Sequence, residues 1–304
     1  MRASADPEPV ARRGRLRAVV ALMRADQWVK NAFVLGGLVF GQGLLDAGKV
    51  QAVLTTFALF CVVSSAAYVM NDIADLEADR DHVRKRRRPI AAGEISVAAA
   101  QVLYVVLMGA GFVGALVWVP AVFPYLAGYA LLNVGYSFGL RRFELLDVIS
   151  IATGFVLRVQ AGCAAMPIDP SAWILLCTFV LALFLGFGKR RFELVEGVTV
   201  GTLMDDRRAT YETRFLDHMM SISSAVVIVC YTMFTIWPTT VAVHGTDDLI
   251  YTVPFVIYGV FRYQWAIYHG GTSGDPGDFV WRDRPLMGAI VLWGLVCLLL
   301  VYGR

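Results

Sequence analysis

Long apolar runs recur from one end of this chain to the other, and they constrain its fold more than any other feature. Of its 304 residues, 58% are hydrophobic, whereas soluble domains contain roughly 45–50% apolar residues. Runs of roughly 18 or more apolar residues are long enough to cross a bilayer as helices. The sequence therefore predicts an all-α fold, a polytopic membrane helical bundle.

We expect about nine transmembrane helices. Residues 1–24 form a polar, basic N-terminal arm, and residues 25–304 form the transmembrane domain. The five cysteines are scattered singly through apolar segments, which argues against a disulfide framework and against a cysteine-rich metal site. The expected spans lie near residues 31–46, 50–71, 97–118, 121–139, 146–165, 171–188, 219–242, 250–268 and 286–303.

Lysine and arginine residues are distributed unevenly between the loops. The chain carries 27 of them, concentrated in the N-terminal arm, in residues 77–90 and 189–214, and in two short pieces around Arg141 and Arg282. Cytoplasmic loops are enriched in basic residues, so we expect a multi-pass protein of the cell (plasma or inner) membrane with a cytoplasmic N-terminus. The basic runs follow this topology and lack a folded soluble domain, so we expect no nucleic-acid partner.

An acidic motif marks the end of the second expected span. Asp72, Asp75 and Asp79 recur at spacings of three and four residues, so on a helix they share one face, and Asn71 precedes them. Three neighbouring carboxylates repel one another, and a hard cation such as Mg²⁺ relieves that repulsion while leaving room for substrate phosphates. The alternative is a solvated loop. The regular spacing favours a metal and diphosphate site at the membrane surface.

Basic side chains accompany the acidic motif on the same membrane face. A run from Arg84 to Arg88 follows it, and Lys189 lies in the cationic segment that closes the sixth expected span. Lysine and arginine suit phosphate oxygens, so we expect Lys85 and Arg88 to contact phosphate. The alternative for all of these residues is an ordinary cytoplasmic anchor.

One arginine lies within a span rather than beside it. Arg158 is roughly a dozen residues into the fifth expected span, which places it about 18 Å deep. A charge at that depth costs at least about 2.5 kcal/mol, so we expect it to face a polar cavity or an anion. The alternative is a structural pair with a buried carboxylate. Arg262 lies nearer a span end and can extend to the surface.

The acidic motif, placed after the second span, resembles the UbiA superfamily of intramembrane prenyltransferases. Further segments are similar to its decaprenyl-phosphate phosphoribosyltransferase branch, and together they identify residues 25–304 as a UbiA-like transmembrane catalytic domain. Where aromatic prenyltransferases of the superfamily carry a second Asp-rich motif, this chain has a cationic stretch. The segments that carry the resemblance are Gln27–Asn31, Lys85–Gly93, Tyr136–Arg141, Gly188–Leu194 and Arg282–Arg284.

The resemblance implies a Mg²⁺-dependent pentosyltransferase. It would transfer 5-phosphoribosyl from 5-phosphoribosyl 1-diphosphate to a polyprenyl (decaprenyl) phosphate, giving a β-linked product for cell-envelope arabinan (arabinogalactan) synthesis. We assign the catalytic carboxylates as Asp72, Asp75 and Asp79, and the metal-binding residues as Asn71, Asp75 and Asp79. We expect the donor phosphates to be bound by Lys30, Tyr68, Lys85, Arg88 and Lys189. We expect the lipid phosphate to be bound by Arg141 and Arg158.

Two rival functions remain open at this point. One is an aromatic polyprenyltransferase that uses a polyprenyl diphosphate. The other is a transporter of lipid-linked intermediates, against which we count the lack of a visible inverted repeat. The partners expected for the favoured function are 5-phosphoribosyl 1-diphosphate, a polyprenyl phosphate and the bilayer. A homo-oligomer is compatible with the sequence, which leaves the oligomeric state open.

Overall fold

A computed structural model describes residues 14–82, 85–200, 211–269 and 276–303, and these parts are helices and turns without a strand. Arg84 and residues 1–13 of the expected N-terminal arm lie outside the described residues. The first elements along the chain are α1 (Arg15–Met23), η1 (Ala25–Leu35), α2 (Gly36–Phe40), α3 (Ala47–Ala74), α4 (Leu76–Asp81), η2 (Lys85–Arg87), α5 (Val97–Trp118), η3 (Pro120–Val122), α6 (Phe123–Phe138), η4 (Leu140–Arg142) and α7 (Leu146–Ala164). The remaining elements are α8 (Ala172–Val200), α9 (Thr213–Ile236), α10 (Pro238–His244), η5 (Asp248–Thr252), α11 (Val253–Tyr268), α12 (Pro276–Arg282) and α13 (Arg284–Tyr302).

The expectation of an all-α membrane bundle is confirmed, but the count of about nine spans is not. Six of the described helices are long and apolar enough to cross a membrane: α3, α5, α7, α8, α9 and α13. Helices α6 and α11 contain 16 residues each, which makes each about 24 Å long, shorter than a hydrocarbon core of about 30 Å. The first expected span is divided between the 3₁₀ segment η1 and the short helix α2.

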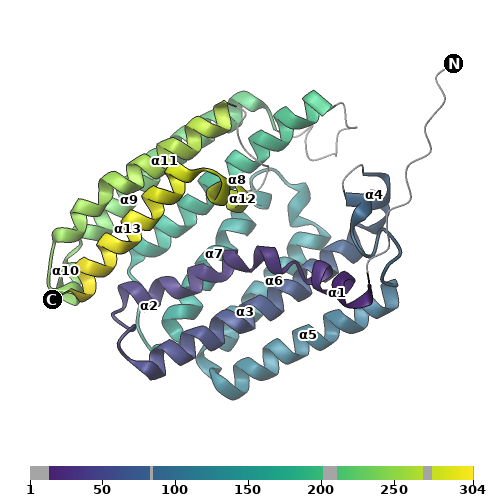
Figure 1. Cartoon of the computed structure of the whole chain (residues 1–304), viewed down its shortest axis with the longest axis horizontal. Helices are drawn as coiled ribbons and strands as arrows, with labels where there is room; N and C mark the ends of the chain where they lie inside the picture. Colours follow the sequence, from purple (N-terminus) through teal and green to yellow (C-terminus); the bar gives the residue numbers. More distant parts are fainter. Residues whose placement is uncertain (1–13, 83–84, 201–210, 270–275, 304) are drawn as a thin grey trace.

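The core divides between two half-bundles, and in Figure 1 the green-to-yellow helices α9, α11 and α13 belong to the second of them. The first half-bundle (η1, α2, α3 and α5–α7) packs around buried Phe60 and Leu126. The second (α8, α9, α11 and α13) packs around Phe184 and Met220. Helix α7 packs against α8 and joins the halves. At the far end of the bundle, the Tyr302 hydroxyl on α13 donates to backbone carbonyls of α2 and closes the arrangement.

The segment η1 is an 11-residue 3₁₀ helix, although such runs rarely exceed about four residues. Tertiary contacts hold it in this form. The Trp28 indole N–H donates to Ser65 Oγ at 3.0 Å, and the Asn31 amide donates to Ser64 Oγ at 3.2 Å. On the opposite side, a Cβ added at Gly162 would lie 2.0 Å from the backbone oxygen of Val34. Glycine at this position therefore permits η1 to press directly against α7.

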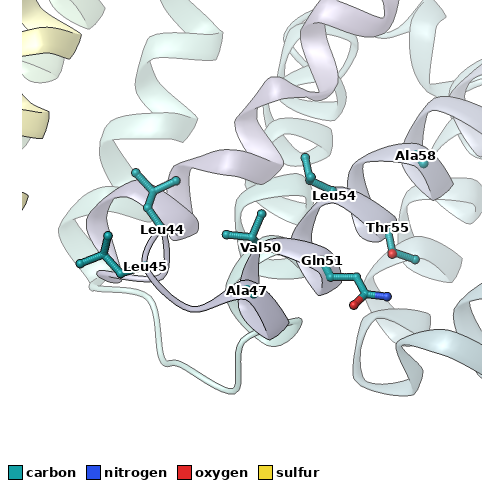
Figure 2. A pocket seen from close by; sticks show the side chains of 8 residues that line it. All are labelled: Leu44, Leu45, Ala47, Val50, Gln51, Leu54, Thr55 and Ala58. Carbon is teal, nitrogen blue, oxygen red and sulfur yellow. The ribbon is translucent and has the colours of Figure 1, made fainter.

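An apolar groove of about 710 Å³ lies along the first half of α3 (Figure 2). It is remote from the acidic motif, because even Ala58, its member farthest along α3, precedes Asp72 by about 21 Å of helix. The groove therefore belongs to the other end of the bundle from the residues that sequence analysis singles out. Its lining residues are Leu44, Leu45, Ala47, Val50, Gln51, Leu54, Thr55 and Ala58.

Candidate active site

The acidic motif lies where α3 ends and α4 begins. Asp75 terminates α3, and its backbone N–H donates to the Asn71 carbonyl at 2.9 Å. The backbone N–H of Asp79 in turn donates to the Asp75 carbonyl at 2.8 Å, so the chain continues in nearly helical register. Because that register is kept, Asp72 and Asp79 point to the same side, and both are buried, at 2% and 1% exposure.

Three arginines from three separate segments meet these carboxylates. Arg88 Nη1 lies 2.5 Å from Asp79 Oδ2 and 3.1 Å from Asp72 Oδ1, so it bridges the two. Arg24 forms a second ion pair with Asp72, and Arg141 Nη1 lies 2.5 Å from Asp75 Oδ1. We call the six residues Asp72, Asp75, Asp79, Arg24, Arg88 and Arg141 the acidic cluster.

Arg24 occupies a special backbone position beside the motif. It stands between α1 and η1 with a φ of 51°, a left-handed conformation that is uncommon outside glycine. Its guanidinium carbon lies 5.0 Å from the centre of the Tyr68 ring, one turn before Asp72 on α3. Tyr68, expected to contact donor phosphate, therefore supports an arginine of the acidic cluster in this structure.

The acidic cluster offers oxygen ligands that suit Mg²⁺, but not a complete cage. The Asn71 side-chain oxygen accepts from Ser137 Oγ of α6, and the three carboxylates face guanidinium groups. In the part of the chain that the structure describes, no three His, Cys, Asp or Glu side chains form a ready-made metal site. The donor set fits a cation that takes its remaining ligands from substrate phosphates, as Mg²⁺ commonly does.

A second charged cluster lies where α6, α7 and α8 meet. Arg190 of α8 donates from Nε to Asp147 Oδ2 at 2.7 Å, from Nη1 to Glu193 Oε2 at 2.7 Å and from Nη2 to the Tyr136 hydroxyl at 3.3 Å. The Tyr211 hydroxyl donates to Asp147 Oδ1 at 2.7 Å. Burial and this hydrogen bond to a carboxylate raise the pKa of Tyr211, so the phenol stays protonated and able to donate. We call Arg190, Asp147, Glu193, Tyr136 and Tyr211 the Arg190 cluster.

The η2 segment connects the two clusters. Lys85 and Lys189 both interact electrostatically with Glu193. Three residues after Lys85, Arg88 reaches Asp72 and Asp79. Of the cations that sequence analysis assigns to the donor phosphates, Lys85 and Lys189 therefore lie near Glu193, and Arg88 lies in the acidic cluster.

The sequence profile of the UbiA prenyltransferase family matches residues 31–279. The chain belongs to the UbiA prenyltransferase family. It is 31% identical to the decaprenyl-phosphate phosphoribosyltransferase of Mycobacterium tuberculosis, over 90% of this chain and 91% of that protein. It is also 31% identical to the enzyme of the same name from Corynebacterium glutamicum, over 93% of this chain and 86% of that protein.

A solved UbiA homologue from Archaeoglobus fulgidus, bound to DMAPP and Mg²⁺, has the same fold. Its TM-score with this chain is 0.70, at 16% sequence identity, and the match covers 92% of this chain and 99% of that one. The family identity predicted from the sequence is confirmed by the family profile and by the two relatives. At this level of sequence identity the structural likeness concerns the fold alone.

In this UbiA family member, Arg158 contacts neutral protein groups. It is 5% exposed, and it donates from Nε to Asn31 Oδ1 at 2.8 Å, from Nη1 to the Gly154 carbonyl at 2.9 Å and from Nη2 to the Tyr129 hydroxyl at 2.9 Å. Its guanidinium also lies 4.4 Å from the centre of the Tyr129 ring. Neutral acceptors and aromatic faces thus surround the guanidinium in this structure, and the assignment of Arg158 to the lipid phosphate stays a prediction.

Arg262 is part of the packing of the second half-bundle. It makes a two-pronged contact with Asp283, with Nη2 2.7 Å from Oδ2 and Nε 3.1 Å from Oδ1. Asp283 also caps α13 by accepting from the Leu286 N–H at 2.9 Å. The acidic residue of the Arg282–Arg284 segment therefore fixes the start of α13.

Sequence reasoning missed several residues of these clusters. Arg24 precedes the segments that carried the resemblance, and no local pattern links it to Asp72. Asp147 is a single carboxylate at the start of a span, which reads as an ordinary interfacial residue. Arg190 and Glu193 stood within a recognised segment and share one helical face at a spacing of three residues, so their pairing could have been anticipated.

Proposed function

We propose that this protein is a glycosyltransferase that moves a 5-phosphoribosyl group from 5-phosphoribosyl 1-diphosphate to a polyprenyl phosphate and releases diphosphate. The observation that carries the proposal is the acidic cluster at the end of α3, together with Lys85 and Lys189, which both interact with Glu193 of α8. The two relatives named decaprenyl-phosphate phosphoribosyltransferase support it at 31% identity over most of the chain.

The carboxylates of Asp72, Asp75 and Asp79, with the Asn71 side chain, would hold the divalent cation together with the donor's diphosphate. Mg²⁺ bound there would supply Lewis-acid assistance to the departing diphosphate. The solved homologue bound to DMAPP and Mg²⁺ supports this choice of metal.

Fixed cations have to hold two substrates whose negative charges repel each other. Lys30, Lys85 and Lys189 serve the donor phosphates with Arg88, and Tyr68 acts beside them. Arg24 joins this set because it already reaches Asp72. Arginine and lysine both suit this role, since their N–H groups form charge-assisted hydrogen bonds with phosphate oxygens.

Arg141 serves the lipid phosphate, because its contact with Asp75 brings it next to the metal-binding residues. A phosphate oxygen of the lipid attacks the anomeric carbon of the ribose, the bond to diphosphate breaks, and the bonding electrons leave with diphosphate. The α-linked donor then gives a β-linked product. The lipid phosphate is already ionised, so no general base is required, and catalysis rests on positioning and on charge stabilisation.

The active site faces the cytoplasm, where phosphorylated sugars occur, and the basic loops on that side follow the positive-inside rule. The lipid enters from the bilayer. Arg158, which holds Asn31 of η1, acts on the reaction by fixing the segment that carries Lys30.

Purified protein in detergent should convert 5-phosphoribosyl 1-diphosphate, Mg²⁺ and polyprenyl phosphates of several chain lengths into a phosphoribosyl lipid identified by mass. Parallel reactions with an isoprenyl diphosphate and an aromatic acid test the aromatic prenyltransferase alternative. Turnover without a membrane gradient would exclude a transporter as the explanation. Product from the aromatic acceptor alone would overturn the proposal.

A further inference from the structure

We infer that the outer face of α11, together with the junction between α12 and α13, binds an anionic phospholipid of the surrounding bilayer. The phosphate of the headgroup contacts Arg262, Arg282 and Arg284, and one acyl chain lies in an apolar groove along α11. This surface shares no residue with the acidic cluster or the Arg190 cluster. Lipid binding here does not require the proposed reaction.

A groove of about 500 Å³ runs along the exposed side of α11. At about 1.5 Å per residue, it extends about 16.5 Å from Pro254 to Trp265. One leaflet contributes half of a hydrocarbon core of about 30 Å, which is about 15 Å. An acyl chain of a phospholipid therefore matches the groove in length. The lining is apolar or aromatic apart from one arginine, and it consists of Pro254, Ile257, Tyr258, Phe261, Arg262 and Trp265.

The arginine lies toward the end of α11 that is nearer the charged clusters. Arg191 of α8 donates from Nη1 to the carbonyl of Ile267 at 3.1 Å, so the C-terminal end of α11 lies beside the part of α8 that carries Arg190. Arg262 precedes Tyr268, the last residue of α11, by six residues, which is about 9 Å of helix. A guanidinium that close to a helix end can reach the headgroup region of a bilayer.

Arg262 is held in place but keeps hydrogen-bond donors for a ligand. Asp283 accepts from its Nε and Nη2, and its guanidinium carbon lies 4.7 Å from the centre of the Trp265 ring. Trp265 is stacked in turn on His269, with the ring centres 4.4 Å apart. Within the described parts of the chain, Nη1 of Arg262 has no acceptor. This nitrogen can therefore donate to phosphate oxygens without loss of the Asp283 contact.

Two further arginines flank the carboxylate that holds Arg262. Arg282 and Arg284 stand on either side of Asp283 in the sequence, and both are exposed. With Arg262 they supply three positive charges against the one negative charge of Asp283, so an excess of two positive charges remains. Trp281, 66% exposed, adds an aromatic side chain typical of membrane interfaces. Arginines near a membrane surface strengthen the binding of anionic lipid by about fivefold each.

Charge and length together distinguish between the possible occupants. A zwitterionic lipid fills the groove but leaves the excess positive charge without a counter-ion. Inorganic phosphate meets the arginines but leaves the aromatic groove uncovered. A polyprenyl phosphate has the charge, but its chain is much longer than the groove. An anionic phospholipid fits both the charged end and the apolar length of this surface.

The headgroup contact is tested by a lipid preference. The purified full chain in detergent is titrated with dioleoyl phosphatidylglycerol or dioleoyl phosphatidylcholine, and bound lipid is measured by native mass spectrometry. We expect phosphatidylglycerol to bind at least about fivefold more tightly. In the double variant Arg282→Gln with Arg284→Gln, this preference should fall to within about twofold. The matched control, Arg86→Gln with Arg87→Gln, removes two exposed arginines of η2 and should keep the preference.

The groove is tested by a separate variant, Phe261→Ala. Phe261 is 54% exposed and lines the groove, so its loss removes apolar contact with the acyl chain. Because the two lipids carry the same chains, their affinities should fall together, by at least about threefold. Leu131→Ala is the control, since Leu131 of α6 is 73% exposed and lies in the other half-bundle. It should change neither affinity.

Equal affinities for the two lipids in the unmodified protein would overturn the inference. So would an equal loss of preference in the two arginine double variants, which would indicate a general attraction to basic loops. Displacement of phosphatidylglycerol by millimolar inorganic phosphate would assign the arginines to a soluble anion. Tighter binding of a polyprenyl phosphate in competition would assign the groove to the substrate lipid. Either result would exclude the phospholipid as the occupant.

A thermal unfolding profile establishes that each variant is folded. If the glutamine double variant does not fold, Arg284→Gln alone should still reduce the preference by about twofold or more. The double variant Arg282→Lys with Arg284→Lys keeps both charges and should retain the preference. A loss of preference in the lysine variant would show that charge is not what the surface recognises, and would overturn the inference.

Discussion

The two charged clusters of this molecule are built on opposite plans. In the acidic cluster, carboxylates from one continuous stretch, α3 to α4, receive arginines from three distant segments. In the Arg190 cluster, one arginine receives acceptors from α6, α7 and α8. The acidic cluster gathers cations from three segments around the anions of one stretch, and the Arg190 cluster gathers acceptors from three helices around one cation.

Under the proposed function, the acidic cluster is the place where ligands bind, and the Arg190 cluster holds helices together. The arginines of the acidic cluster come from connections beside helix ends, where small movements are cheap. Arg190, by contrast, lies within a long helix and has three acceptors at once, from α6, α7 and α8. We therefore expect substitutions in the acidic cluster to reduce activity first, and substitutions in the Arg190 cluster to reduce stability first.

Arg190→Ala should give the largest effect. It would leave Asp147 buried without its cation, and breaking a buried pair costs about 3–5 kcal/mol. Arg190→Lys should recover only part of this, because one ammonium cannot reproduce the guanidinium fork. Thermal unfolding in detergent measures the change, with exposed Arg86→Ala as the control. An unchanged Tm with impaired turnover would show that the Arg190 cluster serves the substrates directly.

Asp75→Ala should reduce transfer at limiting Mg²⁺ by about 100-fold or more, since Lewis-acid assistance supplies several kcal/mol. Folding should be retained, because Asp75 lies at the junction of two helices and is only partly buried. The control is Glu77→Ala, whose side chain is 84% exposed. Near-normal turnover of Asp75→Ala at limiting Mg²⁺ would contradict the metal assignment.

Arg158→Leu tests whether this buried arginine, which belongs to neither cluster, has a structural role or contacts the lipid phosphate. If its partner were a lipid phosphate alone, removing this buried cation would be neutral or stabilising. In the structure its removal leaves the Asn31 side-chain oxygen and the Tyr129 hydroxyl without a donor, so we expect a loss of about 2 kcal/mol. Unfolding of this variant is compared with Tyr129→Phe, which should cost less. Unchanged stability with a raised KM for the lipid would restore the direct role.

Asp283→Asn should give the smallest effect. The hydrogen bond from Arg262 is the main cause of the lowered pKa of Asp283, so the carboxylate is stabilised in its charged form. That contribution is present above the ordinary carboxyl pKa of about 3.9 and is lost as the pH falls through the lower value of the folded state. The unmodified protein and Asp283→Asn should therefore differ slightly in Tm at pH 7 and converge in acid. A difference that grows in acid would be inconsistent with this ion pair.

Local sequence patterns predicted which carboxylates lie together, but they did not predict which arginines contact them. The three- and four-residue spacing predicted that Asp72 and Asp79 share a face, and the structure brings both to Arg88. Helical spacing carries that information directly. The approach of Arg24 to Asp72 and of Arg190 to Asp147 depends on how distant helices cross, and no short sequence window records such a contact.

The prediction for Arg158 shows a different limit. The expected cost of a charge within the span remains sound, and Asn31, Gly154 and Tyr129 supply acceptors that reduce it. These acceptors come from three elements. A neutral residue such as Asn31 gives no sign in the sequence that it will receive a guanidinium. The division of the first expected span into η1 and α2 was equally hidden, because tertiary contacts stabilise the 3₁₀ form.

The 3₁₀ form of η1 also determines the distance between the two ends of this segment. A 3₁₀ helix rises about 2.0 Å per residue and an α-helix about 1.5 Å, so 11 residues extend about 22 Å instead of about 16.5 Å. The difference of about 5.5 Å exceeds the span of an ion pair, so Arg24 at one end of η1 stays in register with Asp72 only while the segment remains stretched. At the other end of η1, the close contact of Gly162 with the Val34 backbone fixes the position of the segment. A methyl group added at Gly162 would therefore shift η1 and displace Arg24, which lies about 20 Å away along the segment.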